Sequence, residues 1–319
     1  MTKILVTGGA GFIGSAITKK LIDRGDQVVI IDNFNDYYDP KLKEDRIKIF
    51  LKGYKFKLYR GDIRDAKLLE KIFKKEKIDK IVHMAAMAGV RNSIKNPHIY
   101  ADVNVMGGLN LLELAVKYKI KNFVFASSSS VYGNNKKLPF SESDSVDKPM
   151  AMYAATKRAC ELMAHVYNHI HGLNVTALRF FTVFGPWGRP DMALFKFTKN
   201  ILENKPIEVY NYGKMTRNFT YVDDIVAGVI TVLDKCKGYD IVNIGGDKAE
   251  KLMRYIEVIE ENIGKKAKKK MMPMQQGDVP ATVADIRKLR KLGWKPTTGI
   301  EKGIANFVSW YEEYYKKEL

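Results

Sequence analysis

Three residues of this chain have the types and spacing of a proton-transfer site. Tyr153 and Lys157 stand four positions apart in a segment with helical periodicity, so their side chains share one face of the helix. A fixed ammonium beside a phenol favours the phenolate, which lets a tyrosine act as a base near neutral pH. Ser128, in the serine run 127–130, adds a hydroxyl that would complete a site for a sugar alcohol. Oxidation of such an alcohol also needs a hydride acceptor nearby.

A glycine-rich turn near the start of the chain predicts where that acceptor binds. Gly8, Gly11 and Gly14 lie between an expected buried strand and an expected helix. Glycines at this spacing permit a tight turn, bring backbone amides to a pyrophosphate and let the helix pack close to the sheet. Asp32 ends the second expected strand, where a carboxylate binds an adenosine ribose diol and repels a 2′-phosphate. The pattern therefore predicts NAD rather than NADP.

Apolar strands and amphipathic helices alternate through the first half of the chain. Strands are expected over 3–7, 27–31, 54–59, 81–83, 122–126 and 174–180, and helices over 15–24, 66–75, 102–118 and 153–171. This order is typical of an α/β fold of the Rossmann type, a doubly wound parallel sheet. The alternation changes after residue 180. We therefore expect an NAD-binding domain over 1–180 and a smaller mixed α/β substrate lobe over 181–319, partly interleaved with the first.

Several polar residues at expected strand ends or helix starts have two readings. Asp62 either faces the adenine edge or caps the next helix, and Arg91 either meets a substrate anion or solvent. His83, in a buried strand, is expected to be packed rather than catalytic. Asn104 lies among apolar neighbours and should be hydrogen-bonded inside the fold. On the helix over 153–171, the buried side is expected to carry Leu162, Val166 and Ile170, with Cys160 beside them.

Composition limits the class of protein. The 46 % hydrophobic and 28 % charged residues fit a soluble globular protein, and we expect neither a signal peptide nor a membrane span. The two cysteines, Cys160 and Cys236, lie far apart, which indicates buried thiols and a cytoplasmic location. The net charge of +18 comes from lysines spread along the chain. Even the densest cluster, 265–270, indicates a solvated surface rather than a nucleic-acid site.

These motifs resemble those of the extended short-chain dehydrogenase/reductase family, the nucleotide-sugar epimerases and dehydratases. The superfamily motifs are Gly8-x-x-Gly11-x-x-Gly14 and Tyr153-x-x-x-Lys157, and the branch motif is Ser-Ser-x-x-Val-Tyr-Gly around Ser128. The segments 88–91, 179–192, 217–221 and 277–280 are similar to those of UDP-glucuronate 4-epimerases. The resemblance covers nearly the whole chain.

The resemblance implies an NAD-dependent inversion at carbon 4 of a UDP-uronic acid, with Tyr153 as base, Ser128 holding the hydroxyl and Lys157 assisting the tyrosine. The expected NAD contacts are Gly8, Gly11, Phe12, Ile13, Gly14, Asp32, Asn33, Asp62, Ile63, Ala85, Ala86, Asn104, Tyr153 and Lys157. The expected substrate contacts are Arg91, Ser128, Ser129, Ser130, Thr182, Arg189, Met192, Tyr210, Arg217 and Asp278. No metal is expected, since the chemistry needs none and the sequence has no metal-ligand cluster.

Residues 129, 130 and 182 narrow the substrate. Related decarboxylases and dehydratases carry acids after the catalytic hydroxyl, whereas this chain has Ser129 and Ser130. Galactose-type epimerases usually carry asparagine where Thr182 stands. Hydroxyls at these three positions could hold a carboxylate without helping it to leave as carbon dioxide. Met87, Asn218 and Phe184 depart from the family pattern. A 4-epimerase of a neutral UDP-hexose therefore stays as the alternative.

Two further hypotheses concern assembly and turnover. A dinucleotide-sensing regulatory protein with this fold is disfavoured, because it would not need Ser128, Tyr153 and Lys157 together. As commonly in this family, the amphipathic helices over 101–118 and 153–171 could form a four-helix contact in a homodimer. Their alternative is burial within the chain's own fold.

Overall fold

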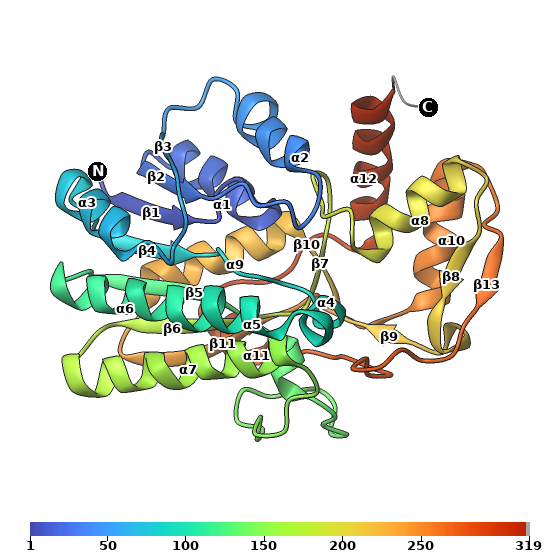
Figure 1. Ribbon diagram of the computed structural model, residues 1–319. Coiled ribbons are helices and arrows are strands. Elements are labelled where there is room, and N and C mark those ends of the chain that lie inside the picture. The colour runs from blue at the N-terminus through green and yellow to red at the C-terminus, as the bar shows by residue number, and fades with distance from the viewer. Residues whose placement is uncertain (317–319) are drawn as a thin grey trace.

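A seven-stranded parallel sheet organises the computed structural model, which describes residues 1–316 (Figure 1). The strands are β1 (Lys3–Thr7), β2 (Gln27–Asp32), β3 (Lys57–Arg60), β4 (Lys80–His83), β5 (Asn122–Ser128), β6 (Val175–Phe180) and β11 (Tyr239–Ile244). Their order is β11-β6-β5-β4-β1-β2-β3. After β1 the chain adds β2 and β3 on one side of it, and then crosses to the other side, where β4 pairs with β1. In such sheets a crevice for a ligand opens at this point, at the carboxyl ends of the strands.

Helices cover both faces of the sheet (Figure 1). One face carries α1 (Phe12–Asp23) and α9 (Val222–Lys235), and the other carries α3 (Ala66–Glu76), α6 (Gly107–Lys117) and α7 (Met152–His171). Neighbouring residues of β1 separate accordingly: Ile4 belongs to the first core and Leu5 to the second. Burial on both faces explains why these strands are continuous apolar runs rather than alternating ones.

The helix that ends at Lys117 is longer and more irregular than the sequence indicated. It runs through α5 (Pro97–Tyr100), a π-helical turn η2 (Ala101–Met106) and α6. Over 97–117 it is long and apolar enough to cross a membrane by length and composition alone, but half of the tested window is buried in the fold. Because it packs against α7 and α3, we describe it as a core helix.

A second lobe stands beside the carboxyl edge of the sheet (Figure 1). Its elements are β7 (Thr182–Phe184), α8 (Ala193–Leu202), β8 (Ile207–Val209), η4 (Tyr210–Gly213), β9 (Thr216–Arg217), β10 (Phe219–Tyr221), β12 (Glu250–Lys251), α10 (Leu252–Ile263), β13 (Lys269–Met271) and α12 (Ile300–Tyr315). Between them the chain returns to the main sheet as α9 and β11, followed later by α11 (Arg287–Lys291), which packs on β11. The boundary at residue 180 stays a prediction.

Short elements connect the strands at the carboxyl edge. They are α2 (Pro40–Asp45), the π-helical turn η1 (Arg46–Phe50), α4 (Val90–Lys95) and the 3₁₀ turn η3 (Ser129–Tyr132). Expected boundaries differ from the observed ones by a few residues: the third strand starts at Lys57 rather than at 54. The seven-stranded sheet itself confirms the predicted Rossmann-type α/β fold.

The expected buried face of α7 is wrong. Leu162, Val166 and Ile170 are 52 %, 47 % and 64 % exposed, whereas Cys160 and Ala164 are buried. The sheet-facing side of α7 also carries Lys157 and Glu161, so polar residues occupy the buried stripe. Residue type alone therefore pointed to the opposite side of the helix.

Candidate functional site

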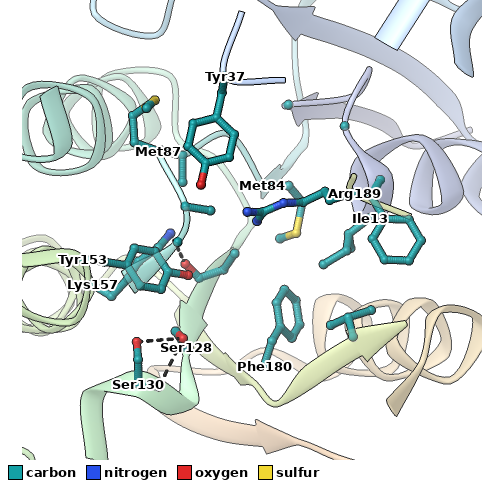
Figure 2. A pocket seen from close by; sticks show the side chains of 18 of the residues that line it. Ile13, Tyr37, Met84, Met87, Ser128, Ser130, Tyr153, Lys157, Phe180 and Arg189 are labelled. Carbon is teal, nitrogen blue, oxygen red and sulfur yellow. Dashed lines mark hydrogen bonds between the residues drawn. The ribbon is translucent and has the colours of Figure 1, made fainter. Parts of the chain in front are cut away.

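A cavity of about 490 Å³ lies along the carboxyl edge of the sheet, in the crevice between β1 and β4. Its wall combines the glycine turn, the ends of β2, β4 and β5, the start of α7, and the loops that follow β6 and β13. Figure 2 shows Tyr153 and Lys157 on one side, Ser128 and Ser130 below them, and Arg189 opposite. The cavity thus brings together residues from both halves of the chain.

The glycine turn is shaped so that nothing larger than hydrogen fits at two positions. Gly8 has φ +69°, and a Cβ there would lie 2.7 Å from Ala85 N. A Cβ on Gly14 would lie 2.1 Å from Gly8 O. The first turn of α1, which begins at Phe12, has no side-chain cap, so its amides are available to an anion. These features fit the pyrophosphate of a dinucleotide.

Asp32 is fixed at the end of β2 by the backbone. Its carboxylate accepts hydrogen bonds from Ala10 N at 3.0 Å and Phe34 N at 2.9 Å. Burial raises the pKa of the Asp32 carboxyl, and these two amides oppose that effect. Asp32 lines the cavity, as expected for a ribose ligand.

The structure excludes one of the two readings of Asp62, that of a helix cap. Asp65 is the residue that caps α3, by accepting from Leu68 N at 2.9 Å, so the capping alternative for Asp62 is wrong. Asp62 instead accepts from Asn33 Nδ2 at 2.9 Å and lines the cavity with Asn33. It can therefore meet the adenosine end of a dinucleotide.

His83 and Asn104 support the cavity from behind. His83 is buried, with Nδ1 2.7 Å from Thr7 Oγ1, and burial lowers the pKa of its imidazole to about 3. Asn104 bonds Met87 N at 2.8 Å, Met87 O at 3.0 Å and Thr156 Oγ1 at 3.0 Å. Both match the expected packing. Asn104 does not line the cavity but holds Met87, which does, so its direct contact with NAD stays a prediction.

The three residues of the proton-transfer site lie together. Lys157 Nζ donates to Ala126 O at 2.6 Å and lies 5.9 Å from the centre of the Tyr153 ring. Ser128 Oγ accepts from Ser130 N at 3.2 Å and from Ser130 Oγ at 2.9 Å (Figure 2). All three side chains line the cavity. The carbonyl of β5 therefore fixes the ammonium, while the phenol and the serine hydroxyl face open space.

A buried ion pair that the sequence did not reveal anchors this strand end. Glu161, one turn after Lys157, accepts from Arg179 Nε at 2.9 Å and Nη2 at 2.8 Å. Glu161 also accepts from Ser127 Oγ at 2.6 Å. The spacing of Glu161 four residues after Lys157 was the signal that could have found it. Because both charges are buried and bonded, the pair fixes the direction of the serine run.

The substrate-side arginines are already paired with carboxylates. Arg189 binds Asp191 through Nε at 2.9 Å and Nη2 at 2.5 Å. Arg217 Nη2 binds Asp278 Oδ1 at 2.7 Å. Burial lowers the pKa of the Arg217 guanidinium, and Asp278 opposes that effect. All four side chains line the cavity.

Other expected contacts are divided between the cavity and its rim. The remaining cavity-lining members are Ile63, Ala85, Ala86, Ser129, Ser130, Thr182 and Met192. Arg91 and Tyr210 do not line it. They pack on each other, with the guanidinium 5.1 Å from the ring centre, and Arg91 lies 3.8 Å from Asp278. Both lie at the rim of the cavity, and their contact with the substrate stays a prediction.

The loop between β2 and α2, together with α2 itself, supplies lining residues that sequence reasoning missed. Tyr37, Tyr38 and Lys43 line the cavity. Tyr37 OH donates to Asp191 at 3.4 Å, and Lys43 Nζ donates to Asn35 O at 2.6 Å. Burial lowers the pKa of the Lys43 ammonium to about 8. The position of this polar segment directly after Asp32 was the available signal. Within residues 1–316, no cluster of metal-binding side chains was found.

The parallel sheet, the glycine turn and the Tyr153–Lys157 pair define a dinucleotide-dependent enzyme of the short-chain dehydrogenase/reductase type. The chain belongs to the NAD dependent epimerase/dehydratase family, whose model matches residues 4–245. The cofactor is NAD, and the shape of the turn fits it.

Similar proteins are known from bacteria and archaea. An uncharacterized protein of Methanocaldococcus jannaschii is 52 % identical over 97 % of this chain and 96 % of its own length. A probable UDP-glucuronate 4-epimerase of Rhizobium meliloti is 43 % identical over 99 % of this chain and 98 % of its own. The crystal structure of UDP-glucuronic acid 4-epimerase from Bacillus cereus, with UDP-glucuronic acid and NAD, is 34 % identical, with a TM-score of 0.91 over 98 % of this chain and 100 % of that one.

Proposed function

We propose that this chain is a UDP-glucuronate 4-epimerase, which interconverts UDP-glucuronate and UDP-galacturonate. The observation that carries the proposal is the set of side chains beside the catalytic tyrosine. Ser129 and Ser130 line the cavity directly after the catalytic hydroxyl of Ser128, at the positions where related decarboxylases and dehydratases carry acids. At positions 129 and 130 the site therefore has hydroxyl groups instead of the acids that would drive elimination or decarboxylation.

Tyr153 removes the proton from the hydroxyl on carbon 4 and returns it after inversion. NAD, when bound, accepts the hydride from that carbon and gives it back. Ser128 Oγ already accepts two hydrogen bonds from Ser130, so its own proton is directed toward the cavity and can be donated to the sugar oxygen. Lys157, fixed by Ala126 O, holds its positive charge on the same side as the phenol.

The carboxylate of the uronic acid is held by hydroxyl groups. Ser129, Ser130 and Thr182 lie on adjoining strand ends, since β5 pairs with β6 and Thr182 follows β6. Hydroxyl donors stabilise a carboxylate without adding a proton or a full charge, so they restrain the group during the 4-keto stage. Ser129 and Thr182 can donate directly, whereas Ser130 can donate to the carboxylate only when it releases Ser128 Oγ. This arrangement favours return of the hydride over loss of carbon dioxide.

The uridine diphosphate end of the substrate is assigned to the arginines. A guanidinium suits the paired oxygens of a phosphate, and Arg189 and Arg217 lie on the lobe side of the cavity. Each is paired with an acid, Asp191 or Asp278, so binding of the diphosphate requires these ion pairs to open or to share the guanidinium.

Incubation of the purified protein with UDP-glucuronate, followed by NMR, tests the proposal. We expect the anomeric and carbon-4 signals of UDP-galacturonate to appear until the two epimers reach equilibrium. A parallel sample holds UDP-glucose. Conversion of UDP-glucose alone would overturn the uronic-acid assignment in favour of a neutral hexose, and conversion of neither would overturn the epimerase itself.

A homodimer is also proposed, through the outer faces of α6 and α7. These helices pack side by side in front of the sheet (Figure 1), and α7 exposes Leu162, Val166 and Ile170 on the side away from it. Met106, just before α6, is 51 % exposed. A contiguous exposed apolar surface of this kind is typical of an interaction site, and a second copy would complete a four-helix contact.

Sedimentation velocity tests the dimer. Val166→Glu places a charge in the centre of the apolar face, so we expect a monomer where the wild type sediments as a dimer. Met271→Glu is the control, because Met271 is similarly exposed but lies in β13 of the lobe. A wild-type monomer, or a dimer that tolerates Val166→Glu, would contradict this interface.

A cytoplasmic location is proposed from the cysteines. Cys160 and Cys236 are both free and buried, as expected for thiols kept reduced in the cytoplasm. Thiol titration of the denatured protein, prepared from its source cells without reductant, should find two thiols per chain. A disulfide-linked or blocked thiol would argue against this compartment.

A further inference from the structure

A fully buried arginine joins the two sides of the site without touching the cavity. Arg46 starts the π-helical turn η1 and is fully buried. Its guanidinium donates to Trp187 O at 2.7 and 3.1 Å, Gly188 O at 3.3 Å, Ala10 O at 3.2 Å and Tyr38 OH at 2.7 Å. Each of these acceptors is a neutral oxygen. The bonds therefore satisfy the donors of Arg46 without neutralising its charge.

One of these bonds reaches the cofactor side. Ala10 belongs to the glycine turn, and its N–H donates to the Asp32 carboxylate. Arg46 binds the carbonyl of the same residue, so both polar groups of Ala10 are held from opposite directions. This fixes the turn whose backbone amides face the pyrophosphate site. The guanidinium also adds positive potential close to the place where the dinucleotide carries its negative charge.

The other bonds reach the substrate side at a point of backbone strain. Trp187 has φ +61°, a left-handed conformation that is strained for a bulky residue. Its indole packs against Phe50, Trp310 and Tyr314, while Arg46 holds its carbonyl. The surrounding structure thus imposes this conformation on the loop.

The strained loop carries Arg189, a positively charged side chain on the substrate side of the cavity. Two residues after Trp187, Arg189 enters the cavity, followed by its partner Asp191. A change in the peptide at Trp187–Gly188 would therefore redirect the guanidinium that faces the substrate. Arg46 is the described side chain that bonds both this peptide and the glycine turn.

We propose that Arg46 is a positioning residue that couples binding of NAD to binding of the uridine diphosphate portion of the substrate. A ligand bound to one loop restrains the bonds that Arg46 makes there, and Arg46 transmits this restraint to the other loop, so the second ligand restricts less motion when it binds. The proposal rests on the proposed function only in naming uridine diphosphate as the ligand of the substrate loop.

Calorimetric titration of NAD into protein freed of nucleotide, with and without saturating UDP, tests the coupling. We expect UDP to tighten NAD binding in the wild type by about fivefold or more, the lower end of ordinary coupling between sites. Arg46→Lys keeps the charge but cannot span the two loops, so the ratio of the two affinities should fall to near one. Arg24→Lys, an arginine paired with Asp26 and Asp234 on the surface, is the control and should keep the wild-type ratio.

A ratio of affinities separates positioning from simple loss of stability, since a general weakening of NAD binding leaves the ratio unchanged. An unchanged ratio in Arg46→Lys, or a wild-type ratio of one, would overturn the proposal. If Arg46→Lys does not fold, Tyr38→Phe serves instead, because it removes one acceptor of the same guanidinium. We expect this variant to lower the ratio of affinities in part. An unchanged ratio would equally overturn the proposal. Because UDP is the probe, coupling in a protein that fails to epimerise UDP-glucuronate would contradict the proposed function and leave the role of Arg46 intact.

Discussion

The cofactor side and the substrate side of the cavity differ in how far they are arranged in advance. On the cofactor side, the polar groups are fixed by the backbone: Asp32 is held by two amides, and Gly8 and Gly14 leave room that no side chain can fill. On the substrate side, Arg189 and Arg217 are held by carboxylates. One side can receive its ligand as it stands, whereas the other must exchange partners when a diphosphate arrives.

This difference suits a cycle in which the cofactor stays and the sugar leaves. Amides and a glycine turn that are already fixed lose little conformational freedom when a ligand binds, so they favour long residence of a dinucleotide. An arginine that returns to Asp191 or Asp278 has a partner after the product leaves, which limits the cost of release. Tyr153 and Lys157, to which we assign the proton transfer, stand between the two sides.

Replacement of the base should have the largest effect. Tyr153→Phe removes the phenol oxygen and keeps the ring, so we expect kcat to fall by about 10³-fold, within the range for loss of a general base. NAD content should stay at the wild-type level. Both are measured on the purified protein, by a coupled epimerase assay and by nucleotide release on denaturation. Tyr118→Phe, outside the cavity, is the matched control, and full activity in Tyr153→Phe would refute the assignment.

Replacement of a substrate-side arginine should weaken binding of the sugar nucleotide without weakening binding of NAD. Arg217→Gln removes the charge near the diphosphate, and we expect KM for UDP-glucuronate to rise about 30-fold, equal to about 2 kcal/mol for a bond to a charged group. NAD affinity should change little. Arg254→Gln, an exposed arginine paired with Glu261, serves as the control. Equal losses of NAD and sugar affinity would show that the two sides are not arranged independently at this position.

Substitution at the hydroxyl cluster should change selectivity more than stability. Thr182→Asn replaces a hydroxyl by an amide, so we expect kcat/KM for UDP-glucuronate to fall about fivefold more than kcat/KM for UDP-glucose, near the value of one hydrogen bond. Steady-state assays with both sugars measure the ratio. Thr231→Asn, on the exposed side of α9, is the control. If both sugars lose equally, Thr182 does not contact the carboxylate.

The last prediction concerns stability rather than turnover, and it involves the histidine beneath the cofactor side. The pKa of His83 is lowered by burial to about 3, below the value near 6.5 of an unfolded histidine. As the pH falls below 6.5, only the unfolded chain takes up this proton, so the free energy of unfolding should drop by roughly 2 kcal/mol between pH 7 and 5. His83→Gln should lose that part of the slope, and the exposed His98→Gln should keep it. Urea unfolding at several pH values gives the slopes, and parallel slopes for all three proteins would contradict a buried neutral imidazole.

The parts of the site that sequence spacing predicted depend on short-range geometry. Gly8, Gly11 and Gly14 are constrained within one turn, and Tyr153 and Lys157 within one turn of a helix, so local periodicity sufficed. The assignment of Arg91 and Tyr210 to the substrate depended on how separate loops meet, and the structure moves both to the rim. The prediction of the buried face of α7 was wrong because that face carries Glu161. The charge of Glu161 is neutralised there by Arg179 of strand β6.

The sequence by itself determined the class of chemistry: an alcohol base, its cation and a dinucleotide turn, each encoded within a few residues. Only the tertiary structure decided which acids hold the arginines, which side of α7 is exposed, and how Arg46 connects residues that are 36 and 141 positions away along the chain. The physical reason is the range of the interactions. Turns and helix faces follow from neighbouring residues, whereas buried charges take their partners from whichever segments the sheet brings to the same edge.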